Sequence, residues 1–266
     1  MSRTIKDLSE GQIIYLEEIV DNHNNQTTYV PYIYLGLDEI GNAIILRKEI
    51  VGYRRMNNVN IAEYIGCDMD LYLNNMRGEI WKTIDKQEKI VVDYTTNGFL
   101  SRFDEATRNA FTKTQIKHYV LNDKTTVTLN RECFLLSYTN LGYAKTPDEG
   151  KSYLNALKTA NNTINDNTAR IARKSSGSAD WYWMSSEFLE TQFRCSRYYG
   201  GRGSDEASYG GNGLRPALSV LPSTIVSEQS ERIIYLLPDK NNNKYECDFV
   251  KNMTYDELCD FVEARE

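Results

Sequence analysis

With 266 residues, 41% of them hydrophobic and 26% charged, the chain has the size and composition of a folded globular protein. Its formal net charge of -6 disfavours nucleic acid and anionic membranes as partners, since both require a basic face. No apolar run approaches the roughly 18 residues of a membrane span, and residues 1–12 lack the apolar core of a signal peptide. We therefore expect synthesis in the cytoplasm without membrane insertion.

Cysteine and histidine are too sparse to suggest a metal centre. The two histidines are His23 and His118, and no C-x-x-C pair is present. We expect reduced, structural thiols and neither a metal nor another cofactor. The five cysteines are Cys67, Cys133, Cys195, Cys247 and Cys259.

The first fifty residues predict a β-meander. Segments 12–17, 29–37 and 42–50 are rich in β-branched and aromatic residues, and polar turn clusters separate them. Pro31 lies within the second segment. Because proline cannot donate a hydrogen bond to a β-ladder, we expect an edge position or a bulge there.

Residues 68–84 predict an amphipathic helix with Asp68 as its N-cap. We interpret its apolar stripe as a core-facing side rather than a cofactor site. The stripe consists of Met69, Leu73, Met76, Ile80 and Ile84.

The pattern between residues 85 and 178 is mixed. The polar segment 161–178 is poor in apolar residues and predicts a long loop. The expected strands are 90–94, 123–129 and 133–137, and the expected helices are part of 106–121 and all of 148–160.

Beyond Pro222 the sequence predicts an appendage, so we expect a domain at 1–222 and a docking segment at 223–266. A strand at 232–237 and its hairpin partner at 245–250 are followed by a short helix that starts at Thr254. So short a helix must dock on its own domain or on a neighbouring subunit to persist.

Catalytic motifs are missing from the sequence: it contains no G-x-S-x-G, P-loop or H-E-x-x-H pattern. The glycines between residues 200 and 213 lead into Arg215-Pro216 and an apolar, β-like run, whereas a phosphate-binding loop leads into a helix. Adjacent carboxylates at Asp205 and Glu206 would face opposite sides of a strand. Calcium at these carboxylates stays an alternative, although EF-hand spacing is absent.

The segment 188–212 resembles an antibody paratope in composition. Tyrosine offers rigid amphipathic contact area, arginine offers forked donors, and Ser, Gly and Asn adapt around them; the same set suits carbohydrate. The alternative is an irregular, glycine-rich hairpin that binds nothing. The candidate ligand-binding residues are Arg194, Arg197, Tyr198, Tyr199, Arg202, Asp205, Tyr209 and Asn212.

Four motifs in chain order resemble the DUF6273 family of low-GC Gram-positive bacteria and their phages, over residues 1–222. They are FLLSYTNLG at 134–142, DEGK at 148–151, WYWMS at 181–185 and GLRPAL at 213–218. The GLRPAL motif is similar to the end of the C-type-lectin-like fold, which formylglycine-generating enzymes share with variable phage tropism proteins.

The resemblance implies an α+β, C-type-lectin-like domain of short strands with two or three helices. It also implies a structural role for Arg215, a core position for Trp183 and an exposed, variable surface at 186–212. Two departures matter. WYWMS replaces the family's usual WWLRS, and formylglycine-generating enzymes need paired cysteines where this chain has only Cys195.

We therefore expect a non-enzymatic protein of a phage virion or phage-tail-like particle, on its tail, baseplate or capsid surface. Its expected partners are a host cell-surface glycan or protein, other particle subunits and further copies of itself in a homo-oligomer. One alternative is a structural baseplate or capsid decoration protein that binds only other virion subunits. A second alternative is an enzyme whose catalytic residues are spread through the sequence.

Overall fold

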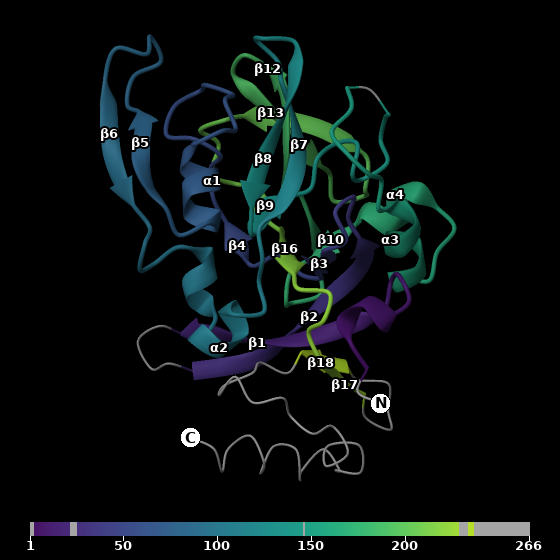
Figure 1. Ribbon diagram of the computed structural model, residues 1–266. Helices are drawn as coiled ribbons and strands as arrows, with labels where there is room; N and C mark the ends of the chain where they lie inside the picture. The colour runs from purple at the N-terminus through teal and green to yellow at the C-terminus, as the bar shows by residue number, and fades with distance from the viewer. Residues whose placement is uncertain (1–2, 22–25, 146, 229–233, 237–266) are drawn as a thin grey trace.

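The computed structural model describes residues 3–21, 26–145, 147–228 and 234–236 (Figure 1). These residues form mostly β-strands in several sheets, with short helices between them, so the protein is α+β or mainly β. The sequence predicts two or three helices for the domain, and the described residues form four short α-helices. No helix in this part of the chain is long and apolar enough to cross a membrane.

The larger sheet has seven strands in the order β17-β18-β1-β2-β3-β16-β9. The predicted meander forms its middle, and the GLRPAL segment supplies β16, which lies between β3 and β9 and is buried along its whole length. The inner strands of this sheet include β1 (Ile13–Asp21), β2 (Gln26–Leu37), β3 (Ala43–Arg47) and β16 (Pro216–Val220), and β9 (Cys133–Leu135) is at its edge.

Pro31 is not at an edge, because β2 pairs with β1 on one side and with β3 on the other. The carbonyl oxygen of Pro31 accepts a hydrogen bond from the N–H of Lys48 at 2.9 Å, just past the end of β3. The nitrogen and oxygen of one strand residue point to the same side, so the missing donor faces the place where β3 has ended. The irregularity in β2 falls instead between Tyr34 and Gly36, so the expectation for Pro31 was wrong.

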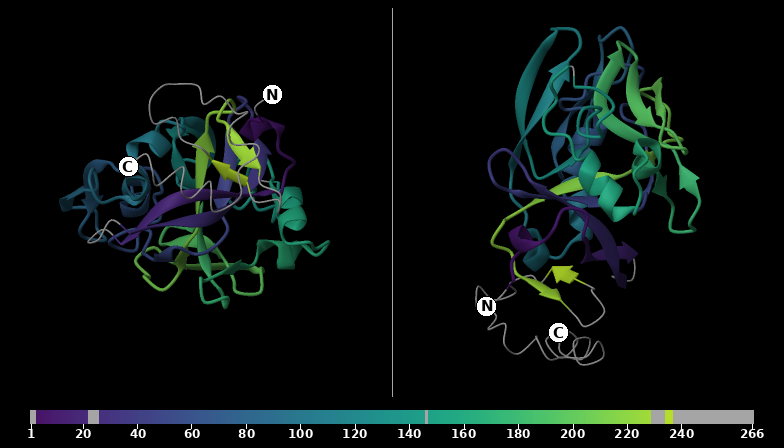
Figure 2. Two further views of the ribbon diagram at one scale, coloured as in Figure 1. Left: turned by 90° about the horizontal axis from the view of Figure 1, so that it is seen from below. Right: turned by 90° about the vertical axis from the view of Figure 1, so that its right-hand side faces the viewer.

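The second sheet has five strands in the order β14-β13-β12-β15-β4. Figures 1 and 2 show that β12, β13 and the β7–β8 ribbon stand at one end of the molecule, opposite β1 and β17. The strands of this sheet are β4 (Gly52–Tyr53), β12 (Tyr182–Leu189), β13 (Gln192–Ser196), β14 (Arg202–Glu206) and β15 (Gly213–Leu214).

Arg215 alone separates β15 in one sheet from β16 in the other. Its buried guanidinium donates from Nε to the carbonyl oxygen of Arg47 at 3.0 Å. Trp183 is also buried, and its Nε1 donates to the carbonyl oxygen of Arg54 at 2.7 Å. Both residues therefore occupy the structural positions that the family resemblance implies.

The remaining strands form two-stranded ribbons. The predicted strands at 90–94 and 123–129 correspond to β6 and β8. The ribbons are β5 (Arg77–Trp81) with β6 (Lys89–Asp93), β7 (Thr114–Val120) with β8 (Thr125–Arg131), and β10 (Ala172–Arg173) with β11 (Ala179–Asp180).

The helix predicted over 68–84 is wrong beyond its first two turns. Helix α1 spans only Asp68–Leu73, and the chain then continues into β5. Asn75 adopts a φ of 50°, in the left-handed region, which stops the helix. Met69 in α1 and Ile80 in β5 are both buried, so the apolar stripe predicted for one helix is divided between a helix and a strand.

The N-cap of α1 is Cys67, whose Sγ accepts from the N–H of Asp70 at 3.5 Å. Asp68 is instead buried against Arg54, with 3.2 Å between its Oδ1 and Nη2 of the arginine. Asn165 caps another helix, α4, inside the segment predicted as a loop over 161–178. The other short helices are α2 (Glu105–Arg108), α3 (Leu154–Ala160) and α4 (Asp166–Arg170), with 3-10 turns at Ile5–Asp7 and Phe99–Arg102.

The core consists of two apolar clusters, one on each face of the larger sheet. Along β2, Tyr32 and Tyr34 face the first cluster, whereas Ile33 and Leu35 face the second. This alternation follows from the two-residue period of a strand. Because both faces are buried, β2 is apolar over most of its length.

The first strands beyond Pro222 belong to the larger sheet. Strand β17 (Val226–Glu228) pairs with β18 (Ile234–Leu236), which runs parallel to β1. Strand β18 lies within the predicted segment 232–237, and its antiparallel partner among the described residues is β17. The predicted strand at 245–250 and the helix from Thr254 lie outside the described residues. The domain boundary at residue 222 stays a prediction.

The substitution Val226→Asp tests whether this strand is integral to the fold. Val226 is 3% exposed and belongs to the first core cluster, whereas the control position Leu221 is 39% exposed. A carboxylate at position 226 should lower the free energy of unfolding by roughly 3 kcal/mol, and Leu221→Asp by less than about 1 kcal/mol. Urea denaturation measures both. Equal, small losses would mean that β17 contributes nothing to the core.

Candidate ligand-binding surface

The hairpin β13–β14 carries most of the residues that the sequence predicts for ligand binding. Its register places Arg194 opposite Ser204 and Ser196 opposite Arg202, whereas Phe193 lies opposite Asp205. Since successive strand residues face opposite sides, Arg194 and Arg202 share one face and Asp205 is on the other. The eight predicted residues therefore do not form a single surface.

One face of the hairpin combines two arginines with two aromatic rings, and we call it the arginine face: Tyr138, Phe188, Arg194 and Arg202. The guanidinium carbon of Arg194 lies 3.6 Å from the ring centre of Phe188 and 4.9 Å from that of Tyr138. Nη1 of Arg202 donates to the Tyr138 hydroxyl at 3.5 Å. Arg202 is exposed, and Arg194 and Phe188 are half-buried.

The opposite face is turned toward the core. Oδ2 of Asp205 accepts from Nδ2 of Asn212 at 2.8 Å and lies 3.9 Å from Sγ of Cys195. Asn212 is only 2% exposed. The structure thus removes Asn212 from the candidate surface, because its amide serves to hold the carboxylate of Asp205.

The turn at 197–201 exposes a pair of tyrosines. Tyr198 is 54% and Tyr199 43% exposed, and their rings meet edge to face with 5.1 Å between their centres. Nη1 of Arg197 donates to the Tyr199 hydroxyl at 3.0 Å, and its guanidinium lies 5.1 Å from the ring centre of Trp181. Tyr209, in the turn after β14, is 50% exposed. These tyrosines are accessible to a ligand.

The candidate ligand-binding residues predicted from sequence omit Tyr138, Trp181 and Phe188, although Phe188 begins the predicted segment 188–212. Tyr138 lies more than 50 positions before the hairpin and follows a segment that predicts only a buried strand. Its backbone N–H donates to Oγ of Ser186 at 2.7 Å, which brings it beside β12. A contact of this kind has no local sequence signal.

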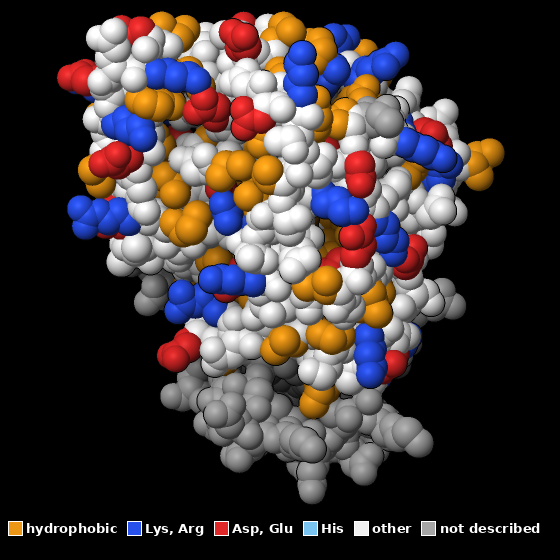
Figure 3. All heavy atoms as spheres, turned by 45° about the horizontal axis from the view of Figure 1, so that its top comes forward, with side chains coloured by type: hydrophobic (Ala, Val, Ile, Leu, Met, Phe, Trp, Pro, Cys, Tyr) orange, Lys and Arg blue, Asp and Glu red, His pale blue; other side chains and the backbone are white. Residues whose placement is uncertain are grey.

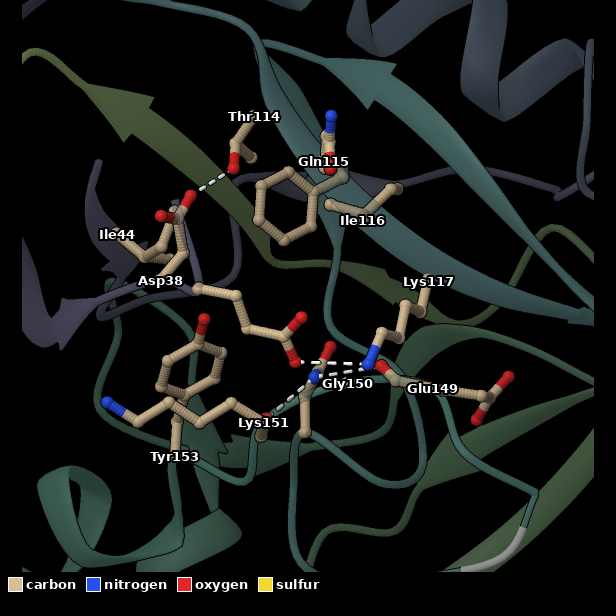
Figure 4. A pocket seen from close by; sticks show the side chains of 13 residues that line it. Asp38, Ile44, Thr114, Gln115, Ile116, Lys117, Glu149, Gly150, Lys151 and Tyr153 are labelled. Atoms are coloured by element: carbon tan, nitrogen blue, oxygen red, sulfur yellow. Dashed lines mark hydrogen bonds and ion pairs between the residues drawn. The ribbon is translucent and has the colours of Figure 1, made fainter. Parts of the chain in front are cut away.

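A small cavity lies elsewhere, between β7 and the segments at 38–39 and 149–151 (Figure 4). Its volume of about 30 Å³ accommodates little more than one or two water molecules. Lys117 reaches Oε1 of Glu39 at 3.1 Å and Oδ2 of Asp148 at 3.3 Å, so its charge is already paired. The predicted ligand-binding residues do not line this cavity.

Buried acidic groups and a histidine link β7 to β12. Nε2 of His118 lies 3.1 Å from Oε1 of Glu187, whose Oε2 accepts from the N–H of Leu121 at 2.9 Å. Oγ of Ser186 donates to Oε2 of Glu149 at 2.5 Å, and burial raises the pKa of that carboxyl. These side chains are closed off from solvent, so we assign them a structural role.

The cysteines in the described part of the chain are buried and unpaired. Burial, followed by the charge of Asp205, raises the pKa of the Cys195 thiol to about 12, which leaves it protonated and a poor nucleophile at neutral pH. Among the described residues, no group of three or more His, Cys, Asp or Glu is placed to hold a metal ion.

Comparison with known proteins places the chain in a family. Searches of curated proteins and of solved structures gave no match. The family model described as "Domain of unknown function (DUF6273)" matches residues 40–222, which is more than half of the chain. The matched region contains both the GLRPAL segment and the β13–β14 hairpin. The chain therefore belongs to the DUF6273 family.

Proposed function

We propose that this protein is a non-enzymatic recognition protein that binds a glycan on a host cell surface through the β13–β14 hairpin and the turn at Tyr209. The observation that carries the proposal is the exposure of Tyr198, Tyr199 and Tyr209, at 54%, 43% and 50%, on backbone anchored to a sheet. Tyrosine rings stack on the apolar faces of sugars, and their hydroxyl groups stay hydrated or bind sugar hydroxyls.

Rigid backbone supports this proposal, because a pre-ordered surface loses less entropy on binding. The hydroxyl of Tyr143 donates to the carbonyl oxygen of Gly200 at 2.8 Å. Gly200 itself has a φ of +76°, and its N–H donates to the carbonyl oxygen of Arg197 at 2.7 Å. A Cβ at position 200 would lie 1.7 Å from the carbonyl oxygen of Asn167, so glycine lets the turn rest against α4.

We further propose that the domain has a C-type-lectin-like fold and is carried on a phage virion or phage-tail-like particle. Family membership and the GLRPAL close at β16 support the fold assignment. The particle location rests on the family resemblance and on the surface composition. Assembly of such a particle in the host cytoplasm, followed by lysis, would bring the protein to a new host surface.

Alanine at both Tyr198 and Tyr199 should weaken binding of the purified protein to host cell-wall fragments by about tenfold, because two stacking contacts are lost. The matched control is Tyr53→Ala, which removes a tyrosine that is 47% exposed at the other edge of the same sheet. A co-sedimentation assay measures the binding. Equal affinity of the double variant and the wild type would refute the proposal, and binding to virion subunits alone would favour a structural role.

The substitution Gly200→Ala tests whether the turn must be held rigid. The added methyl group meets backbone and requires a strained φ, so we expect a loss of roughly 2–4 kcal/mol in unfolding free energy and weaker binding to the same fragments. Gly210→Ala is the control, since a Cβ there meets nothing within 4 Å. Equal unfolding free energies and equal binding for Gly200→Ala and Gly210→Ala would mean that the turn does not require glycine at position 200.

A further inference from the structure

The arginine face carries positive charge that the protein itself does not neutralise. Neither Arg194 nor Arg202 has a carboxylate within 4.0 Å among the described residues. Six other arginines differ in this respect, because each has such a partner: Arg47, Arg54, Arg55, Arg102, Arg131 and Arg170.

The two guanidinium groups converge on one ring. Arg194 lies over the face of Tyr138, and Arg202 donates to the hydroxyl of that tyrosine. Their backbone positions are diagonal neighbours on the same face of the hairpin. Burial, and to a smaller extent the charge of Arg202, lowers the pKa of Arg194, while Tyr138 opposes this shift.

The donors of these arginines are available to a ligand. The guanidinium of Arg194 makes ring contacts and donates no hydrogen bond to the described residues, while that of Arg202 donates a single long one to Tyr138. A guanidinium that stacks on a ring keeps its N–H groups at the edge of its plane, where they bind oxyanions in pairs. Glu149, a carboxylate that attracts Arg194, is buried and accepts from Ser186.

We propose that Arg194 and Arg202 form a subsite for an oxyanion, a phosphate or carboxylate group, on the glycan. This inference rests on the proposed function and adds that the glycan ligand carries negative charge. The neighbouring rings of Tyr138 and Phe188 would contact the sugar to which the anion is attached. Figure 3 shows basic and hydrophobic side chains side by side along the upper right of the face it presents.

The net charge of -6 sharpens this inference. A polyanion is repelled by the protein as a whole, so an acidic glycan would bind only through a local contact with paired donors. A diffuse electrostatic attraction would depend on every surface arginine about equally. Specific recognition would depend on Arg194 and Arg202 far more than on an arginine elsewhere.

The test measures binding of the full chain to three polymers by biolayer interferometry: poly(glycerol phosphate), polygalacturonate and neutral dextran. The variants are Arg194→Gln and Arg202→Gln, and the matched control is Arg77→Gln, which removes the same charge from an exposed position on β5. The substitution Arg194→Lys keeps the positive charge but removes the planar guanidinium and its paired N–H donors. Because Arg202 is exposed, its variant remains informative even if a change at Arg194 impairs folding.

We expect one or both anionic polymers to bind more tightly than dextran, and each Gln variant to weaken that binding about tenfold. Arg194→Lys should weaken it as well, and Arg77→Gln should leave it unchanged. Equal losses for Arg77→Gln, or binding of host cell walls that is independent of both arginines, would overturn the anion subsite and leave the glycan proposal standing. Failure to bind host cell walls at all would overturn the proposed function itself.

Discussion

The arrangement of the two sheets depends on one buried arginine. Arg215 lies between β15 and β16, and its guanidinium reaches the carbonyl oxygen of Arg47 on one sheet and the hydroxyl of Tyr182 on the other, at 3.0 and 3.5 Å. A buried charge without a carboxylate is costly, and its pKa is lowered by burial, so it is tolerated only where its hydrogen bonds fix the packing. Through Tyr182 it positions β12, and through β12 the hairpin that we propose as the binding surface.

The hairpin separates two tasks by the alternation of its residues. One set of side chains packs toward Trp183 and the first core cluster, and the other set faces Tyr138 and solvent. Arg194 and Arg202 belong to the second set, while Asp205 and Asn212 stabilise the first. The segment 188–212 is unusual in composition throughout, but some of its side chains stabilise the fold and others are available to bind a ligand.

Some of the fold follows from sequence and some does not. The meander of β1 to β3 and the buried segment at β16 are predictable, because their apolar runs are bounded by turn residues. Helix α1 is not, because Met69 and Ile80 continue one helical spacing across a break at Asn75. For the site, composition finds the exposed tyrosines. The assembly of Tyr138 with Arg194 depends on the hydrogen bond that holds Tyr138 beside β12, across more than 50 positions from the hairpin, and no local pattern reveals it.

Hydrogen–deuterium exchange of the full chain, with and without host cell-wall fragments, tests the central claim most directly, because it maps the contact without altering the protein. We expect slower exchange of backbone amides at 197–204 and 209–211 when the fragments are present, and unchanged exchange in the β5–β6 ribbon. Protection confined to other segments, or no protection under conditions where the fragments bind, would contradict it.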